Sequence, residues 1–131
     1  LAGARGPLRE RTLPGRRRSG PNRRRGRSRS CRGVEAHARG LSVGLKNSVE
    51  LVPDLITHFD WALNEECLSY SECGSLAPFI AANKAVFHVE YVDDSSEGQA
   101  KLGAVCGQAS TQGFSTLVKT WDLDAWRLAC P

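Results

Sequence analysis

The sequence predicts an α/β fold built on a parallel β-sheet, and three features support this prediction. Short apolar segments at residues 41–47, 59–65 and 85–91 have the length and alternation of buried strands. Residues 48–58 and 75–82, which separate them, carry apolar side chains at helical spacing. All three expected strands end on polar residues, and the connections are short. This order of strands and helices predicts parallel strands, as in a barrel or a doubly wound sheet.

Two residues mark expected helix ends. Gly40 favours the left-handed conformation that ends a helix, so residues 34–39 are predicted to be the last turns of one. Asn83 can take the same conformation after residues 75–82.

The C-terminal third gives a weaker pattern. Residues 92–113 are rich in small and polar side chains without clear periodicity, so we expect a long surface loop. Residues 114–119 and 122–129 are predicted to form a final helical pair, with Asp122 or Asp124 as the N-cap.

The charges divide the chain into two parts. Residues 1–32 hold 12 arginines and a single acidic residue, Glu10, whereas residues 33–131 are acidic overall. The first part has almost no aliphatic side chains and cannot bury a core, so we predict a disordered basic segment followed by one folded part.

The basic segment has two interpretations. An all-arginine bias is typical of GC-rich DNA translated in a wrong frame, but arginines also suit an arm that neutralises nucleic-acid phosphates. The chain starts at Leu1 and contains no methionine, which leads us to expect an incomplete copy of a longer protein.

Polar side chains gather where the expected strands end. These are the ends that carry functional residues in parallel α/β folds, and they hold Lys46, Asn47, Asn64, Glu65 and Glu90.

The two-residue period of a strand predicts which of these side chains share a face. It groups Lys46, Asn64 and Glu90 in a common mouth, with Glu65 at its rim. The same alternation predicts that Trp61 faces the helices. A tryptophan there more often packs in the core than stacks on a sugar.

The two carboxylates of this group are the natural candidates for chemistry. Glycoside cleavage uses a pair of carboxyl groups, and Glu65 and Glu90 are the only ones at strand ends. The alternative for each residue is an ordinary solvated strand end. His88 is expected to pack or hydrogen-bond rather than bind a metal, because no second ligand lies at zinc-like spacing. We therefore predict no metal and no cofactor.

Five cysteines are many for a cytosolic domain of this size. They lack the short pairs of a zinc site, so disulfides and an oxidising compartment are the better explanation. Cys67 and Cys73 bracket a short loop, while Cys106 and Cys130 join the expected long loop to the C-terminal segment. Cys31 is then left without a partner.

Four motifs resemble glycoside hydrolase family 114, the endo-alpha-1,4-polygalactosaminidase-like proteins. They are GLSVGLKN, FDWALNEEC, AVFHVEY and LDAWRLAC, and the resemblance runs from about Val34 to Cys130. It implies a partial (β/α)8 TIM barrel, in which this chain supplies the last three strands and their helices. It also implies secretion and metal-free hydrolysis of a galactosamine-containing polysaccharide.

The resemblance also implies roles for single residues. The glutamate of the family's NE motif corresponds to Glu65, which becomes the catalytic residue. Its partner, an aspartate in an EPDN-type motif, has no counterpart here, so we expect an inactive copy. The implied substrate-binding residues are Lys46, Asn47, Asn64, Glu90 and Tyr91. The pairs Cys67 with Cys73 and Cys106 with Cys130 match disulfide positions, whereas His88 and residues 93–107 depart from the family pattern.

The expected partner is therefore a polysaccharide, with no membrane span, since no stretch approaches the roughly 18 apolar residues that one needs. Nucleic acid is the less favoured partner, through the arginine-rich arm. A carbohydrate-binding remnant without catalysis is a further alternative.

Overall fold

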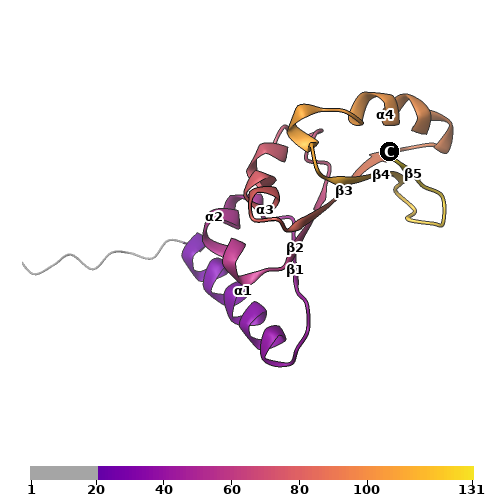
Figure 1. Cartoon of the computed structure of the whole chain (residues 1–131). Coiled ribbons are helices and arrows are strands. Elements are labelled where there is room, and N and C mark those ends of the chain that lie inside the picture. Colours follow the sequence, from indigo (N-terminus) through magenta and orange to yellow (C-terminus); the bar gives the residue numbers. More distant parts are fainter. Residues whose placement is uncertain (1–20) are drawn as a thin grey trace, which may run out of the picture.

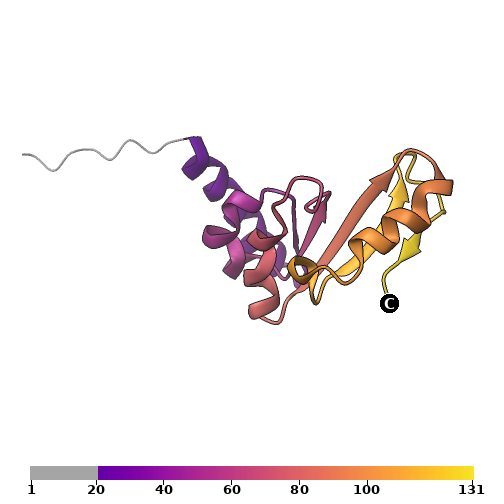
Figure 2. The same ribbon diagram turned by 90° about the horizontal axis from the view of Figure 1, so that it is seen from above.

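The computed structural model describes residues 21–131, with side chains from residue 30 onward. Figures 1 and 2 show a curved β-sheet with the helices gathered along one of its faces. The disorder that the sequence predicts for residues 1–20 lies outside the described residues.

The sheet has five strands in the order β1-β2-β3-β4-β5. The first four are parallel and the last pair is antiparallel. The strands are β1 (Gly44–Lys46), β2 (Trp61–Glu65), β3 (Ala85–Val92), β4 (Ser115–Thr120) and β5 (Leu128–Ala129). The α/β fold with a parallel sheet is thus confirmed, and β1 to β3 are the three predicted strands.

Short helices connect the strands. The β1–β2 connection holds η1 (Val49–Leu51), α2 (Val52–Leu55) and η2 (Ile56–His58), and the β2–β3 connection holds η3 (Cys73–Leu76) and α3 (Ala77–Ala81). Both regions were predicted to be helical. Gly40 and Asn83 have φ of 71° and 55°, so both predicted left-handed positions are confirmed.

The first helix is longer than the sequence predicts. Helix α1 (Pro21–Ala38) begins 13 residues before the expected last turns, within the segment expected to be disordered. Arginine has a high helix propensity, and a helix formed at residues 34–38 gains one hydrogen bond for each residue added at its N-terminus. Helix α1 thus includes residues 21–32, which belong to the segment for which the sequence predicts disorder.

The prediction was wrong for the C-terminal third. Residues 115–120 form strand β4 where a helix was expected over residues 114–119, because Thr116, Val118 and Thr120 place β-branched side chains along one face. Residues 122–129 form a turn and β5. The turn is held by Lys119 Nζ, which donates to the carbonyl oxygens of Asp124 at 2.5 Å and Trp126 at 2.9 Å.

The expected loop at residues 92–113 contains η4 (Ser95–Glu97), α4 (Gly98–Val105) and η5 (Ala109–Thr111). Helix α4 is built largely from glycine and alanine, so it has no apolar stripe for the sequence pattern to show. It packs on β4 through Leu102 and Val105. Residues 21–131 therefore supply four parallel strands and one short antiparallel strand, where the sequence predicted three strands.

The hydrophobic core lies on the face of the sheet that the helices cover. Leu45, Ala62, Val86 and Val118 point into it from the four parallel strands, and all are at most 1% exposed. Residues one position away point to the opposite face, which no element among residues 21–131 covers (Figure 2). We call this second side the open face.

Candidate functional site

Glu65 is the last residue of β2, on the open face. Its carboxylate accepts hydrogen bonds from Asn47 Nδ2 at 3.0 Å and from the Tyr91 hydroxyl at 2.9 Å. It also forms an ion pair with Lys46. These contacts join the C-terminal ends of β1, β2 and β3 at one point, where parallel α/β folds carry their functional residues.

The sheet register brings these residues together. Glu65 is opposite Val89 in β3, so Tyr91, two residues further on, points to the same face. Asn47 follows β1 with φ of 52°, a left-handed conformation that asparagine tolerates better than most residues. This turn lets Asn47 Oδ1 accept a hydrogen bond from the Glu65 amide at 2.9 Å, so Asn47 binds both the backbone and the side chain of Glu65.

These partners set the charge of the site. Hydrogen bonds from Lys46 and Asn47 hold the pKa of Glu65 below its usual range, so the carboxylate is ionised at neutral pH. Burial and the neighbouring Glu65 raise the pKa of Tyr91 to about 12, so its hydroxyl stays protonated and keeps donating. The site therefore presents an oriented, ionised carboxylate that is 29% exposed.

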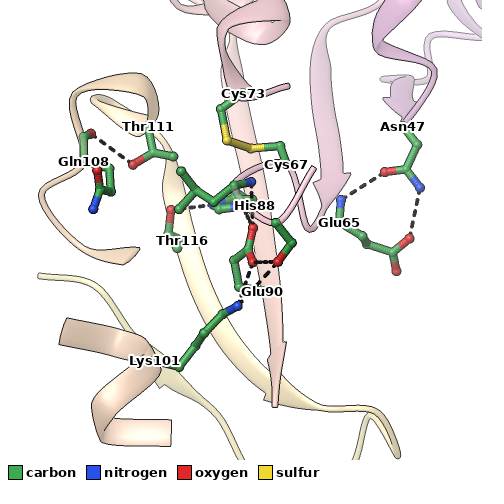
Figure 3. A network of polar contacts seen from close by, with 12 residues as sticks. Asn47, Glu65, Cys67, Cys73, His88, Glu90, Lys101, Gln108, Thr111 and Thr116 are labelled. Carbon is green, nitrogen blue, oxygen red and sulfur yellow. Dashed lines mark hydrogen bonds and ion pairs between the residues drawn. A yellow bond between two sulfur atoms is a disulfide. The ribbon is translucent and has the colours of Figure 1, made fainter. Parts of the chain in front are cut away.

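Glu90 lies on the other side of the sheet and is fully buried. Its carboxylate accepts hydrogen bonds from the Leu68 amide at 2.9 Å and the Ser69 hydroxyl at 2.7 Å. It also contacts His88 Nε2 at 3.0 Å and forms an ion pair with Lys101 of α4 at 3.1 Å. In Figure 3 this group is separate from the Asn47–Glu65 pair.

The donors around Glu90 decide its ionisation. Burial alone would raise its pKa, but hydrogen bonds from His88, Ser69 and the Leu68 amide outweigh burial and lower the pKa to about 2. Since an ionised carboxylate only accepts, His88 Nε2 carries the hydrogen, and Nδ1 lies 3.1 Å from the Thr116 hydroxyl. The buried His88 therefore hydrogen-bonds inside the fold, as predicted.

The predicted mouth of Lys46, Asn64 and Glu90 does not form. Lys46 points to the open face, whereas Asn64 and Glu90 point to the helices. Both polar atoms of the buried Asn64 side chain lack a hydrogen-bond partner among the described residues. The two-residue alternation of side chains correctly divides the residues of β2 and β3 between the two faces of the sheet. It does not say which of these faces the helices cover.

The predicted orientation of Trp61 is wrong for the same reason. It was predicted to face the helices, but it lies on the open face with its ring edge against Phe87, at 5.7 Å between centroids. A Cβ built on Gly44 would lie 2.2 Å from the Trp61 ring, so the glycine leaves space for the indole.

Sequence reasoning missed two residues near the site. Trp121, which follows β4, stacks on Tyr91 at 4.3 Å between ring centroids, and its indole nitrogen donates to Asp93 at 3.0 Å. No sequence signal connected Trp121 to the site, because β4 had been predicted as a helix.

Both predicted disulfides are present, Cys67–Cys73 and Cys106–Cys130, and Cys31 is free and exposed. Cys67, Cys73 and His88 form the single group of metal-ligand type found among residues 21–131. Its two sulfurs are joined to each other, so in this state the group offers no thiolate.

The parallel sheet, covered by helices on one face and carrying a hydrogen-bonded carboxylate at the strand ends on the other, has the layout of part of a β/α-barrel enzyme. The sequence profile of glycoside-hydrolase family GH114 matches residues 33–131. The chain therefore belongs to this family of glycoside hydrolases.

The crystal structure of Aspergillus fumigatus Ega3 in complex with galactosamine is similar to this chain, with a TM-score of 0.66 and 37% sequence identity. The similarity covers 75% of this chain and 41% of the Ega3 chain, so the present chain spans less than half of that structure. No curated protein sequence matches significantly. None of the helices within the described residues is long and apolar enough to cross a membrane.

Proposed function

We propose that residues 33–131 carry part of the active site of a glycoside hydrolase that acts on a galactosamine-containing polysaccharide, with Glu65 as a catalytic carboxylate. The observation that carries this proposal is the setting of Glu65. Three side chains from two other strand ends hold its carboxylate on the open face, where a substrate can reach it.

The proposed substrate class rests on the relative. The Ega3 structure that this chain resembles holds galactosamine, and 37% identity is high enough to suggest a related sugar. Lys46, Asn47 and Tyr91 surround Glu65 on the open face, so they are the proposed substrate-binding side chains. Asn64 and Glu90, on the helix-covered face, are better explained as residues that support the strand ends.

The chemistry of Glu65 follows from its charge. An ionised carboxylate held by Lys46 acts as a base or a nucleophile, whereas an acid must carry a proton. For Glu65 to act as the acid it would need a neighbouring carboxylate, since a like charge raises the pKa. Glycoside cleavage uses two carboxyl groups, so we expect the 131-residue chain alone to release no reducing ends.

The two disulfides support an oxidising compartment, and we propose that the protein is secreted.

A chimera tests the catalytic proposal. Residues 33–131 would replace the matching segment of Ega3, and release of reducing ends from an α-1,4-galactosamine polymer would be measured. Glu65→Gln should lower turnover by at least about a hundredfold while the polymer still binds, because proton transfer or nucleophilic attack is lost.

Glu66→Gln is the matched control, since it changes the adjacent carboxylate of the same strand end. If Glu65→Gln and Glu66→Gln had equal effects, Glu65 would not be the catalytic residue. Polymer binding without turnover in the unsubstituted chimera would instead favour a carbohydrate-binding role.

A further inference from the structure

Trp121 is a large aromatic side chain that is exposed to solvent but held in a fixed orientation. It is 54% exposed, whereas Trp61 and Trp126 are each partly buried against a glycine, Gly44 and Gly98. Two contacts fix its orientation, the parallel stack on Tyr91 and the hydrogen bond to Asp93. Since Tyr91 covers one face of the indole ring, the other face is available to a ligand.

The surroundings of Trp121 are hollow and acidic. A cavity of ≈ 380 Å³ lies between this residue, Asp93 and helix α4, within the size range of small-molecule sites. Asp93 and Glu97 are exposed at its border. Lys101, the only cation among the described residues that line it, is already paired with Glu90, so the two carboxylates leave the cavity negative.

The cavity is continuous with the candidate active site through one residue. Tyr91 lines the cavity and stacks on Trp121, while its hydroxyl donates to Glu65. A polymer whose scissile bond lies at Glu65 would therefore place a neighbouring sugar beside Trp121.

The geometry points to a second sugar subsite on Trp121, occupied by an unacetylated galactosamine residue of the same polysaccharide chain. This inference rests on the proposed function. The galactose configuration leaves the C–H groups of C3, C4 and C5 on one face of the ring, and this apolar face packs on an indole. The ammonium group at C2 is matched by the carboxylates of Asp93 and Glu97, which would not attract an N-acetylated sugar.

Binding to the 131-residue chain tests the subsite without any need for turnover. Isothermal titration calorimetry would compare galactosamine with α-1,4-linked galactosamine trimers. In the unsubstituted chain the trimer should bind more tightly than the monomer. Trp121→Ala should weaken trimer binding by about fivefold to tenfold, as expected for the loss of one stacked ring.

Further variants separate stacking from charge. Trp121→Phe keeps an aromatic face and should retain most of the trimer affinity. Asp93→Asn can still accept from Trp121 but should reduce the preference for the trimer over its N-acetylated form. Leu41→Ala, which removes a side chain exposed to a similar degree (58%), should leave the trimer affinity unchanged.

Two results would overturn the subsite: equal trimer affinities in the unsubstituted and Trp121→Ala chains, or no trimer binding by the unsubstituted chain. Failure of the catalytic proposal has a different signature, because it appears as undiminished turnover of the Glu65→Gln chimera.

Discussion

Gly33 packs against backbone rather than against side chains. It is buried in α1, where a Cβ would lie 2.4 Å from the carbonyl oxygen of His58. A backbone carbonyl cannot rotate away as a long side chain can, so helix α1 approaches η2 this closely only with a glycine at the contact. At Gly103, in α4, no atom of the described residues other than the helix's own backbone and the two neighbouring residues lies within 4 Å of the corresponding position.

The same substitution should therefore have opposite effects at the two glycines. Gly103→Ala should raise the free energy of unfolding by about 0.5–1 kcal/mol, because alanine favours the helix. Gly33→Ala should lower it by about 1–3 kcal/mol, since the steric conflict exceeds the gain in helix propensity. Urea unfolding of both variants measures the difference, and effects of the same sign would contradict it.

At the scale of elements, Glu90 ties together parts of the chain that are far apart in sequence. It projects from β3 and accepts from the loop after β2, through Leu68 and Ser69, and from α4, through Lys101. The Cys67–Cys73 disulfide closes the same loop. Together with the packing of Leu102 and Val105 on β4, this buried anion attaches α4 to the strand ends.

Removing the charge of Glu90 should loosen this attachment. We expect Glu90→Gln to lower the free energy of unfolding by about 2–4 kcal/mol at neutral pH, because it leaves Lys101 without its partner. Glu97→Gln, which changes an exposed carboxylate beside α4, should stay within about 0.5 kcal/mol. Hydrogen exchange should show the loss of protection in α4 and the 66–73 loop first.

The loss of stability caused by Glu90→Gln should become smaller as the pH falls. The folded pKa of Glu90, about 2, is below the unfolded value of 4.5, so its ionisation stabilises the fold above pH 4.5 and this contribution disappears as the pH falls toward 2. The difference in unfolding free energy between the unsubstituted chain and Glu90→Gln should therefore shrink by about 2–3 kcal/mol over that window. Urea titrations at pH 6 and pH 2.5 measure it, and a constant difference would mean that folding does not shift the pKa of Glu90.

For the whole molecule, the open face is the dominant feature. Phe87 is 43% exposed in the middle of β3, and Trp61, Leu63, Val89 and Leu117 are only partly buried on the same side. No strand among residues 21–131 pairs with the outer edge of β1. An apolar sheet face next to an unpaired edge favours association with another chain.

We therefore expect the isolated chain to self-associate at micromolar concentration through this face. Sedimentation velocity should show a concentration-dependent increase in mass, and Phe87→Lys should shift the distribution toward the monomer. Leu123→Lys, at a residue 58% exposed outside the sheet, should leave the distribution unchanged. A monomer at all concentrations would show that exposure of this face does not drive association.

The sequence alone determined the features that depend on local pattern. Apolar alternation located β1, β2 and β3, helical spacing located the segments between them, and Gly40 and Asn83 marked helix ends through their backbone preferences. The lack of short cysteine pairs favoured disulfides over a zinc site, the family resemblance implied the two pairings, and the polar strand ends identified Glu65 as a candidate. Each of these signals is contained in a few neighbouring residues.

Tertiary structure decided which face of the sheet the helices cover. A period of two is the same for both faces, so only packing against α2, α3 and α4 places Glu90 in the interior and Glu65 on the open face. The pairing of Glu65 with Tyr91, 26 residues later, required the register of β2 and β3. Strand β4 and helix α4 were missed for the same reason, because their conformations are stabilised mainly by contacts with distant parts of the chain.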